Sequence, residues 1–209
     1  GEDNDSGHRR RSEATRQSTV RHFNISPKKI RVIHNGFITF PGVPHKVEAP
    51  ARFFLFAGVL KERKNVAGII RAFALFAQNN ATHELLIVGK QGGAYAESLL
   101  RLVRELGIEE RVQFTGYVTD AELAYLYDKA QAFVFPSFIE GFGMPVLEAM
   151  HAGVPVITSN NGALAEVAGD AALLVDPKHP EDVAQAMSCI ASDSQLREEL
   201  TEKGRRRAA

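Results

Sequence analysis

The amino-acid sequence predicts an α/β protein built on a doubly wound, Rossmann-like parallel sheet. From Arg52 onward, short apolar runs alternate with amphipathic stretches of helical periodicity. Most of the apolar runs lack polar alternation and end at glycine, proline or a small polar residue. Strands that are buried on both faces have this pattern, and they are typical of parallel sheets. The regular succession of strand and helix therefore indicates a parallel sheet covered by helices.

The individual elements follow from these patterns. Strands are expected at the apolar runs 53–56, 85–88, 112–114, 132–135, 154–157 and 172–175. Helices are expected at the amphipathic stretches 66–78, 95–106, 120–130, 145–152 and 181–190. A last helix is expected within residues 193–209, with the basic run 205–207 as its solvated end. Tyr125 and Tyr127 fit the packing of their helix better than stacking on a nucleotide base.

Residues 1–50 have a different character. A helix is expected within residues 12–23 and a short strand at 30–33, followed by a turn at Asn35-Gly36 and a proline-rich stretch. Because one helix and one strand cannot enclose a core, residues 1–34 are interpreted as the remnant of a preceding domain. Residues 35–50 are then an interdomain linker, residues 51–192 the main domain, and residues 193–209 a truncated C-terminal helix.

The composition makes several classes of protein improbable. Lys and Arg together number 25, as do Asp and Glu, and this balance gives no indication of a nucleic-acid partner. The single cysteine, Cys189, cannot form an internal disulfide, and no apolar run reaches the roughly 18 residues of a membrane span. Residues 1–11 lack the apolar segment of a secretory signal. A cytoplasmic location is therefore expected.

Residues 135–150 carry the strongest functional signal. A buried strand is followed by a loop with two glycines, and Pro145 then opens a helix at its favoured first position. Unsatisfied backbone donors and the positive end of the helix dipole make such a helix start suited to an anion such as a diphosphate. Glycines in the loop, Gly141 and Gly143, let a ligand approach the backbone closely. The donors expected here are the N–H groups of Phe142, Gly143 and Met144.

Two carboxylates flank this helix start in the sequence. Glu140 lies in the loop, and Glu148 lies about one turn into the helix. Open α/β sheets bind ligands at the carboxyl ends of their strands, so both carboxylates are expected to border one crevice there. Carboxylates are poor partners for phosphate but good acceptors for hydroxyl groups. The predicted ligand is therefore a polyol next to a phosphate: a sugar, a ribose or both.

The segment from Glu140 to Glu148 resembles the Glu-x7-Glu signature of the retaining GT-B glycosyltransferases of family 4. The resemblance covers nearly everything from about Ser12 onward, and the Arg-Lys-Asn and Gly-Lys variants are similar to the mannosyltransferase-like branch. It implies the C-terminal, donor-binding half of a GT-B fold, with a short remnant of the N-terminal domain. Beyond the signature, it rests on the segments 56–65, 87–90, 114–118 and 168–177, and on 31–36 at the end of the first domain.

The resemblance implies a role for each matching residue. Glu140 would hydrogen-bond hydroxyls of the donor sugar, and Glu148 would bind the ribose. Arg63 and Lys64 would neutralise the diphosphate as the sugar leaves, in place of the metal ion that other glycosyltransferases use, so no metal and no cofactor are expected. Composition alone favours Arg63 and Lys64 as a solvated helix-start pair, and only their place after a glycine suggests this role. The base would contact Tyr117 and Val118, and the remaining binding residues would be Gly58, Gly89, Lys90, Gly141, Phe142, Gly143 and Met144.

The function that the resemblance implies is transfer of a hexose, with mannose as the first candidate. The donor would be a nucleoside-diphosphate sugar, GDP-mannose or a UDP-sugar, and the acceptor a glycan or a lipid-linked molecule. The missing N-terminal domain would hold the acceptor and would supply any peripheral contact with the inner face of a membrane. The 209-residue chain is therefore expected to bind nucleotide but to transfer sugar poorly.

Two departures from the family pattern leave alternatives open. Val59 stands where many relatives have arginine, so Arg63 must supply the guanidinium, and residues 162–166 lack the serines that many relatives have. A non-catalytic nucleotide-binding module of the same fold is one alternative, although the acidic and basic pairs together argue against it. A sugar-nucleotide isomerase is another, and it would need acid and base residues from the missing domain. The pattern Asp3-Asn4-Asp5 could bind a metal, but it lies in a polar terminus, where we expect a disordered tail.

Overall fold

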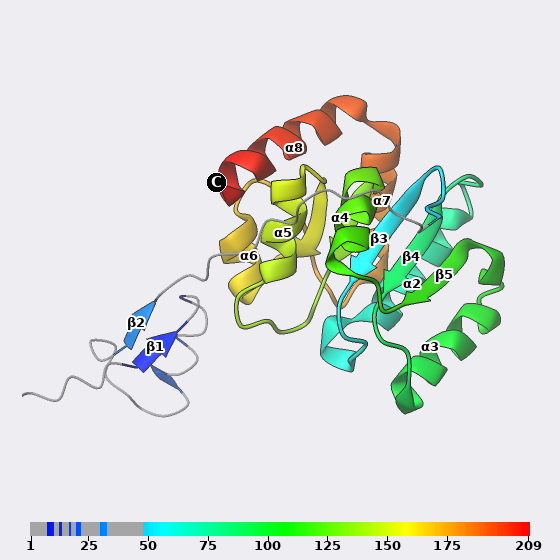
Figure 1. Ribbon diagram of the computed structural model, residues 1–209, viewed down its shortest axis with the longest axis horizontal. Helices are drawn as coiled ribbons and strands as arrows, with labels where there is room; N and C mark the ends of the chain where they lie inside the picture. The colour runs from blue at the N-terminus through cyan, green and yellow to red at the C-terminus, as the bar shows by residue number, and fades with distance from the viewer. Residues whose placement is uncertain (1–7, 11–12, 14–16, 18–19, 22–29, 33–47) are drawn as a thin grey trace, which may run out of the picture.

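The computed structural model describes residues 8–10, 13, 17, 20–21, 30–32 and 48–209. Its body is a six-stranded parallel sheet with helices on both faces (Figure 1). This confirms the predicted α/β fold class. A separate two-stranded parallel sheet pairs β1 (His8–Arg10) with β2 (Ile30–Val32). The strand expected at 30–33 is thus present, whereas β1 was not predicted.

The main sheet has the strand order β5-β4-β3-β6-β7-β8. The chain moves outward from β3 through β4 to β5, then returns to the other side of β3 with β6. The order of the strands therefore reverses between β3 and β6, which are neighbours in the sheet. The bounds are β3 (Phe53–Ala57), β4 (Glu84–Val88), β5 (Val112–Gly116), β6 (Ala132–Phe135), β7 (Val156–Ser159) and β8 (Leu173–Val175).

Helices α2, α3 and α7 cover one face of the sheet, and α4, α5 and α6 cover the other, where α8 packs against α5 (Figure 1). Two short 3-10 helices, η2 (Glu62–Lys64) and η3 (Glu109–Arg111), precede α2 and β5. The helices are α2 (Val66–Ala77), α3 (Gly93–Glu105), α4 (Asp120–Lys129), α5 (Met144–Ala152), α6 (Gly162–Ala168), α7 (Pro180–Ser192) and α8 (Ser194–Ala208).

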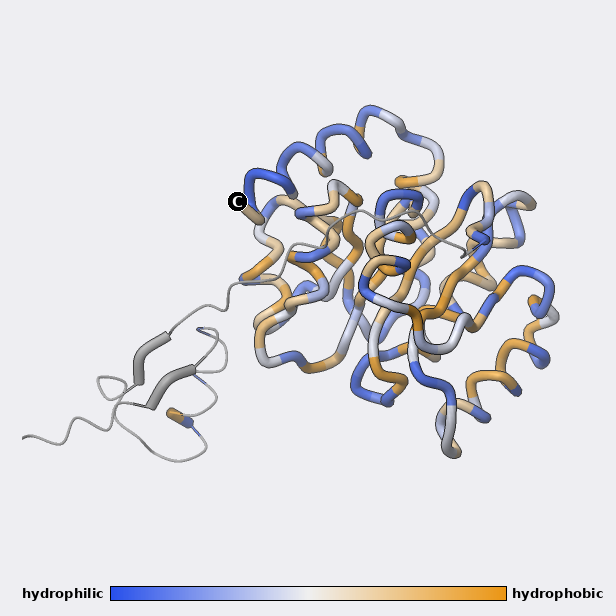
Figure 2. The backbone as a smooth tube through the Cα atoms, in the orientation of Figure 1, coloured by the Kyte–Doolittle hydropathy of each residue, from blue (hydrophilic) through white to orange (hydrophobic). Residues whose placement is uncertain are grey.

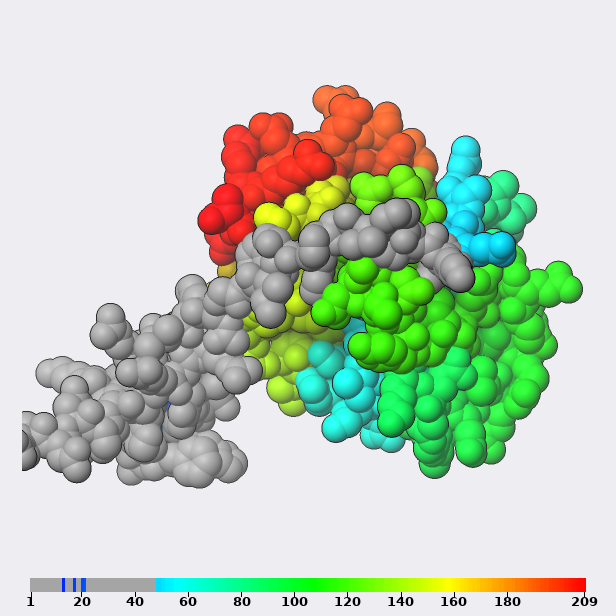
Figure 3. Space-filling view, viewed as in Figure 1, coloured from blue at the N-terminus to red at the C-terminus, as the bar shows by residue number. Residues whose placement is uncertain are grey.

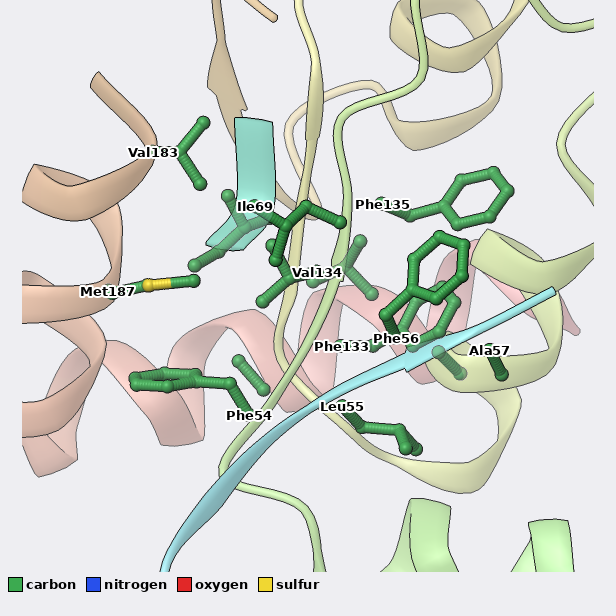
Figure 4. Close-up of a cluster of buried hydrophobic side chains, with 14 of the residues drawn as sticks. Phe54, Leu55, Phe56, Ala57, Ile69, Phe133, Val134, Phe135, Val183 and Met187 are labelled. Atoms are coloured by element: carbon green, nitrogen blue, oxygen red, sulfur yellow. The ribbon is translucent and has the colours of Figure 1, made fainter. Parts of the chain in front are cut away.

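The core lies on both sides of the two central strands. All residues of β3 and β6 are buried, so neither strand has a solvent-facing side. Figure 4 shows their side chains together with Ile69 of α2 and Met187 of α7. The rings of Phe56 and Phe135 stack with centroids 5.8 Å apart, which joins β3 to β6 through side chains as well as through the backbone. The residues of these strands are mainly hydrophobic, whereas those of α8 are mainly hydrophilic (Figure 2).

Most expected elements are present, with shifted ends. β7 begins at Val156 instead of residue 154. Helix α6 was not predicted. The basic end of α8 is exposed, as expected. In addition, the Arg207 guanidinium donates to the carbonyls of Val167 at 2.9 Å and Glu166 at 2.6 Å, at the end of α6. The expected helix at 12–23, the turn at 35–36 and the Asp3-Asn4-Asp5 tail lie wholly or mostly outside the described residues.

A dense polar cluster lies at the amino ends of the strands. The Arg111 guanidinium donates to the carbonyls of Ala77 at 3.2 Å, Asn80 at 2.5 Å and His83 at 2.6 Å. The His83 ring is buried and stacks on Phe54, with its Nε2 2.6 Å from the side-chain oxygen of Gln131. These contacts tie the end of α2 to the starts of β4 and β6.

We predict that His83 makes stability depend on pH. Burial lowers the pKa of His83 below its ordinary 6.5, and the charges of nearby arginines add to this, against the hydrogen bond with Gln131. As pH falls below 6.5, the unfolded chain binds a proton that the folded protein takes up only at lower pH. The free energy of unfolding should therefore decrease through that window.

Urea denaturation at several pH values between about 5 and 7.5 measures this dependence. The variant His83→Gln should flatten it. The variant His151→Gln, which removes an exposed histidine of α5, serves as the control. A profile for His83→Gln as steep as that of the parent would contradict the prediction.

Candidate functional site

The reversal of strand order brings two loops together at the carboxyl edge of the sheet. The first loop (residues 58–65) follows β3 and contains η2; the second (residues 136–143) follows β6 and leads into α5. We call them the β3 loop and the β6 loop. Because parallel strands end at the same edge, both loops lie where open α/β sheets bind their ligands. Figure 3 shows the two loops side by side, η2 in cyan and the β6 loop in yellow-green.

Hydrogen bonds connect the two loops directly. The backbone N–H of Phe138 donates to the carbonyl of Arg63 at 2.9 Å. In return, Arg63 Nη1 donates to the carbonyl of Ile139 at 3.3 Å. The side-chain amide of Asn65 donates to the carbonyl of Pro136 at 3.1 Å. The end of the β3 loop is thus fixed to the first half of the β6 loop.

Three predicted catalytic residues form one group of charges across these loops, here called the charge cluster. Lys64 Nζ lies 2.5 Å from Glu140 Oε1, and Arg63 Nη1 lies 3.2 Å from Glu140 Oε2. The Lys64 and Glu140 side chains are each 10% exposed, whereas that of Arg63 is 49% exposed. Glu140 Oε1 has no partner in hydrogen-bond geometry, so its short contact with Lys64 is an ion pair outside ideal alignment.

Lys64 has an unusual environment for a lysine. Its Nζ lies 4.4 Å from the centre of the Phe135 ring, a distance at which the aromatic face attracts a cation. Burial lowers the pKa of Lys64, the close contact with the charged Glu140 carboxylate raises it, and the charge of Arg63 lowers it. With both basic groups protonated, the charge cluster carries two positive charges against one negative. This excess suits the binding of an anion.

The start of α5 lies at the end of the β6 loop. Gly143 caps the helix with φ 109° and has no side chain to satisfy the first donors, and Pro145 follows in the first turn. Among the described residues, none accepts a hydrogen bond from the N–H groups of Gly143 or Met144. The φ of Gly143 favours glycine, and a Cβ there would also lie 2.8 Å from the end of the Leu164 side chain of α6. The side chain of the neighbouring Phe142 is buried in the core.

Helix α4 begins differently. Thr119 and Glu122 form a capping box, in which the Glu122 carboxylate accepts from the Thr119 N–H at 2.8 Å and the Thr119 hydroxyl accepts from the Glu122 N–H at 3.3 Å. The capping box thus satisfies the N–H groups of Thr119 and Glu122, whereas α5 has no side-chain cap. This difference leaves α5 the better suited of the two to hold an anion at its start.

Glu148 lies on α5, partly buried. Burial raises its pKa, and the charge of Asp120 adds to this. The charge of Glu148 also acts on Tyr127 of α4. Burial, together with this charge, raises the pKa of Tyr127 well above its ordinary value. Tyr127 packs in the core, as expected, and its hydroxyl has no partner among the described residues. Within the described part of the chain, no contact joins Glu148 to Glu140, so their common crevice stays a prediction.

The other predicted binding residues line the ends of β3, β4 and β5. Gly58 donates to the carbonyl of Val88 at 2.9 Å, and Gly89 donates to that of Gly116 at 3.0 Å. A Cβ on Gly89 would collide with the carbonyl oxygen of Gly58, so glycine is required there for the close approach of two strand ends. These contacts give both glycines a structural role. Lys90 is exposed, Tyr117 is 81% exposed, and Val118 packs partly against the core.

Sequence reasoning missed two residues of the site. Phe135 was expected only as the end of a buried strand, but its ring lies under Lys64. Asn65 appeared in the family pattern without a role, although its buried side chain joins the two loops. An asparagine that follows two basic residues and precedes a helix is the one signal that could have suggested a left-handed turn here.

In the described part of the chain, no group of at least three His, Cys, Asp or Glu side chains could hold a metal ion. The same part contains no helix long and apolar enough to cross a membrane.

We predict strong coupling between Lys64 and Glu140 in stability. Glu140→Ala leaves Lys64 buried without its counter-ion, so the free energy of unfolding should fall by about 3 kcal/mol. Lys64→Met keeps an unbranched side chain over Phe135, and it should cost less. In the Lys64→Met background, Glu140→Ala should then have little further effect. Urea denaturation of the four proteins measures the coupling, and simple addition of the two costs would contradict it.

Comparison with known proteins agrees with this architecture. Residues 44–207 match the family described as "Glycosyl transferases group 1". The chain is 38% identical over 152 residues to O-antigen chain mannosyltransferase B of Escherichia coli, covering 73% of this chain and 40% of that protein. It is 32% identical over 185 residues to O-antigen chain mannosyltransferase RfbU of Salmonella typhimurium, covering 88% of this chain and 50% of that protein. The chain thus spans half or less of the length of these two relatives.

Solved structures have the same fold. Sucrose-phosphate synthase from Thermosynechococcus elongatus matches with a TM-score of 0.78 and 26% identity, over 96% of this chain and 52% of that chain. The C-terminal domain of a glycosyl transferase group 1 family protein from Francisella tularensis matches with a TM-score of 0.69 and 25% identity, over 76% of this chain and 85% of that chain. The resemblance to GT-B glycosyltransferases is confirmed, and the chain belongs to the group 1 glycosyl transferases.

Proposed function

We propose that this chain is the donor-binding domain of a retaining glycosyltransferase and that it binds a nucleoside-diphosphate sugar. The observation that carries the proposal is the charge cluster beside the uncapped start of α5. Two basic side chains, Arg63 and Lys64, and two backbone N–H groups without an acceptor among the described residues lie on adjoining loops at the carboxyl edge. Such a combination of fixed cations and aligned donors is suited to a diphosphate.

The names of the relatives favour mannose as the transferred sugar. Both the Escherichia coli and the Salmonella typhimurium relatives are mannosyltransferases of O-antigen chains. We therefore propose a mannosyl donor such as GDP-mannose, and a glycan or lipid-linked acceptor. A structure of the Anabaena protein HepE contains UDP and glucose, but at 21% identity it is similar to this chain in fold alone. A UDP-sugar remains the second donor to test.

In this proposal, the diphosphate binds to Arg63, Lys64 and the N–H groups of Gly143 and Met144. Transfer breaks the bond between the anomeric carbon and the diphosphate, and negative charge develops on the departing oxygen. Fixed positive charge and aligned donors stabilise that charge without rearrangement of solvent, which supports catalysis without a metal ion. The acceptor would attack from the face that the diphosphate leaves, which retains the anomeric configuration.

The remaining predicted residues complete the donor site in the proposal. Glu140 would turn its carboxylate to hydroxyls of the sugar, and Glu148 would bind the ribose. Arg63 reaches the charge cluster from its half-exposed position, and so would replace the arginine that is absent at Val59. The base would contact Tyr117 and Val118, and further ligand contacts would come from Gly58, Gly89, Lys90, Gly141 and Phe142.

The complete enzyme would need a second domain. We propose that residues 1–34 are its remnant, that residues 35–50 are the linker, and that this domain holds the acceptor. Any peripheral contact with the cytoplasmic face of a membrane would also come from it. The 209-residue chain alone should therefore bind nucleotide and transfer sugar poorly.

Isothermal titration calorimetry with GDP and UDP tests the donor site. The wild-type chain should bind at least one of them. Lys64→Ala should weaken this binding by about 10- to 100-fold, because hydrogen bonds to charged groups contribute about 1.5–3 kcal/mol. Lys129→Ala, which removes a lysine more than half exposed on α4, is the control and should leave the affinity unchanged. Equal affinity of Lys64→Ala and wild type would refute the diphosphate assignment.

A further inference from the structure

Asn65 has a strained and buried position between the two loops of the proposed site. In the described part of the chain it is the sole residue other than glycine with a positive φ, at 57°. It ends η2 and caps α2, and it is 5% exposed. Asparagine tolerates this left-handed conformation better than most residues, but a bulky or β-branched residue would not. The backbone turn explains the choice of a small set of residues, glycine among them.

Glycine could adopt the same left-handed turn, but it could not make the hydrogen bonds of the Asn65 side chain. Its Nδ2 donates to the carbonyl of Pro136 at 3.1 Å and to that of Pro177 at 2.6 Å. An asparagine amide has two hydrogens, and both are used. Pro136 begins the β6 loop, and Pro177 follows β8, so one amide connects the segments after three strands of the sheet.

The hydrogen bond from Asn65 to Pro136 joins the two loops that contain the charge cluster. Lys64 directly precedes Asn65, and Glu140 lies in the same loop as Pro136. Lys64 and Glu140 are thus connected in two ways: by their own ion pair, and through the buried hydrogen bond between Asn65 and Pro136. If that bond is lost, the two loops are still joined by the ion pair and by the contacts of Arg63 with Phe138 and Ile139, but the backbone next to Lys64 is no longer tied to the start of the β6 loop.

Gly68 of α2 fits this arrangement. A Cβ at Gly68 would run into the side-chain amide of Asn65. Glycine within a helix costs roughly 0.5–1 kcal/mol relative to alanine, so alanine would ordinarily be preferred at this position. The space that Gly68 leaves is filled by the amide that bonds Pro136 and Pro177.

We propose that Asn65 is a positioning residue for the donor: its amide holds Lys64 and Arg63 at the separation from the start of α5 that a diphosphate requires. Asn65 is buried and acts through these neighbours, without touching the ligand. The inference rests on the proposed function, since it concerns the same site. A purely structural role would lower stability and leave the affinity of the folded protein unchanged.

Two substitutions at Asn65 separate its backbone from its side chain. Asn65→Gly accepts the left-handed turn and removes both hydrogen bonds; Asn65→Asp keeps the shape and replaces the donor with an acceptor. Each should weaken binding of whichever of GDP and UDP the wild-type chain prefers by roughly tenfold, because Lys64 and Arg63 are then held less firmly where the diphosphate binds. Calorimetry is performed below the melting temperature of each variant, so that only folded protein is compared.

A third variant disturbs the Asn65 amide without a change of Asn65 itself. Gly68→Ala should displace the Asn65 side chain while it favours the helix, so it provides a folded protein if the variants at Asn65 do not fold. It should weaken binding in the same direction. Arg111→Ala is the control, because it removes partly buried hydrogen bonds at the opposite edge of the sheet and should lower stability without changing the affinity.

Combination with Lys64→Ala shows whether Asn65 acts through the charge cluster. In that background Asn65→Gly should have a clearly smaller effect than in the wild type. Binding that is unchanged in the folded variants, or a loss that is equally large without Lys64, would overturn the positioning role. Failure of the wild-type chain to bind GDP and UDP would instead refute the proposed function, so the two outcomes are distinguishable.

Discussion

The ion pair between Lys64 and Glu140 joins two loops that are distant in sequence and adjacent in space. Both side chains are largely removed from water, a costly environment for charges that buried apolar residues of the same volume would avoid. Contribution to stability alone is therefore a weak reason for these residues. Their position explains them better, since they lie where the order of strands reverses and where this type of sheet binds its ligands. The proposed site is built around this pair, with α5 on one side and Asn65 beneath.

The amino and carboxyl edges of the sheet differ in the polar groups that they carry. At the amino edge, Arg111 and His83 use partly buried hydrogen bonds to fasten α2, β4 and β6, and none of these bonds involves a predicted site residue. At the carboxyl edge, glycines bring strand ends together, as at Gly89, and α5 begins without a side-chain cap. Both edges therefore contain hydrogen bonds that fasten the fold, but only the carboxyl edge also has the charge cluster and the N–H groups of Gly143 and Met144 in position for a ligand.

The sequence predicts the sheet well because its strands are unbroken apolar runs, as in Phe53–Ala57, and no helical pattern competes with them. It does not predict α6, where small residues such as Ala163 and Ala165 carry almost no periodicity, nor the contact of Arg207 with that helix. Within the site, the Glu-x7-Glu spacing identifies the region, but spacing says nothing of burial. Composition alone favours a solvated Lys64, and its place over Phe135 arises from the pairing of β3 with β6. The role of Asn65 likewise depends on carbonyls from loops far away in the chain.

The decisive measurement is a crystal structure of this chain with GDP or UDP. The diphosphate should lie within hydrogen-bond distance of Lys64 Nζ and of a backbone N–H at Gly143 or Met144. The carboxylate of Glu140 should no longer contact both cations. A diphosphate bound away from the β3 and β6 loops, with the Lys64–Glu140 pair unaltered, would show that these loops do not form the donor site.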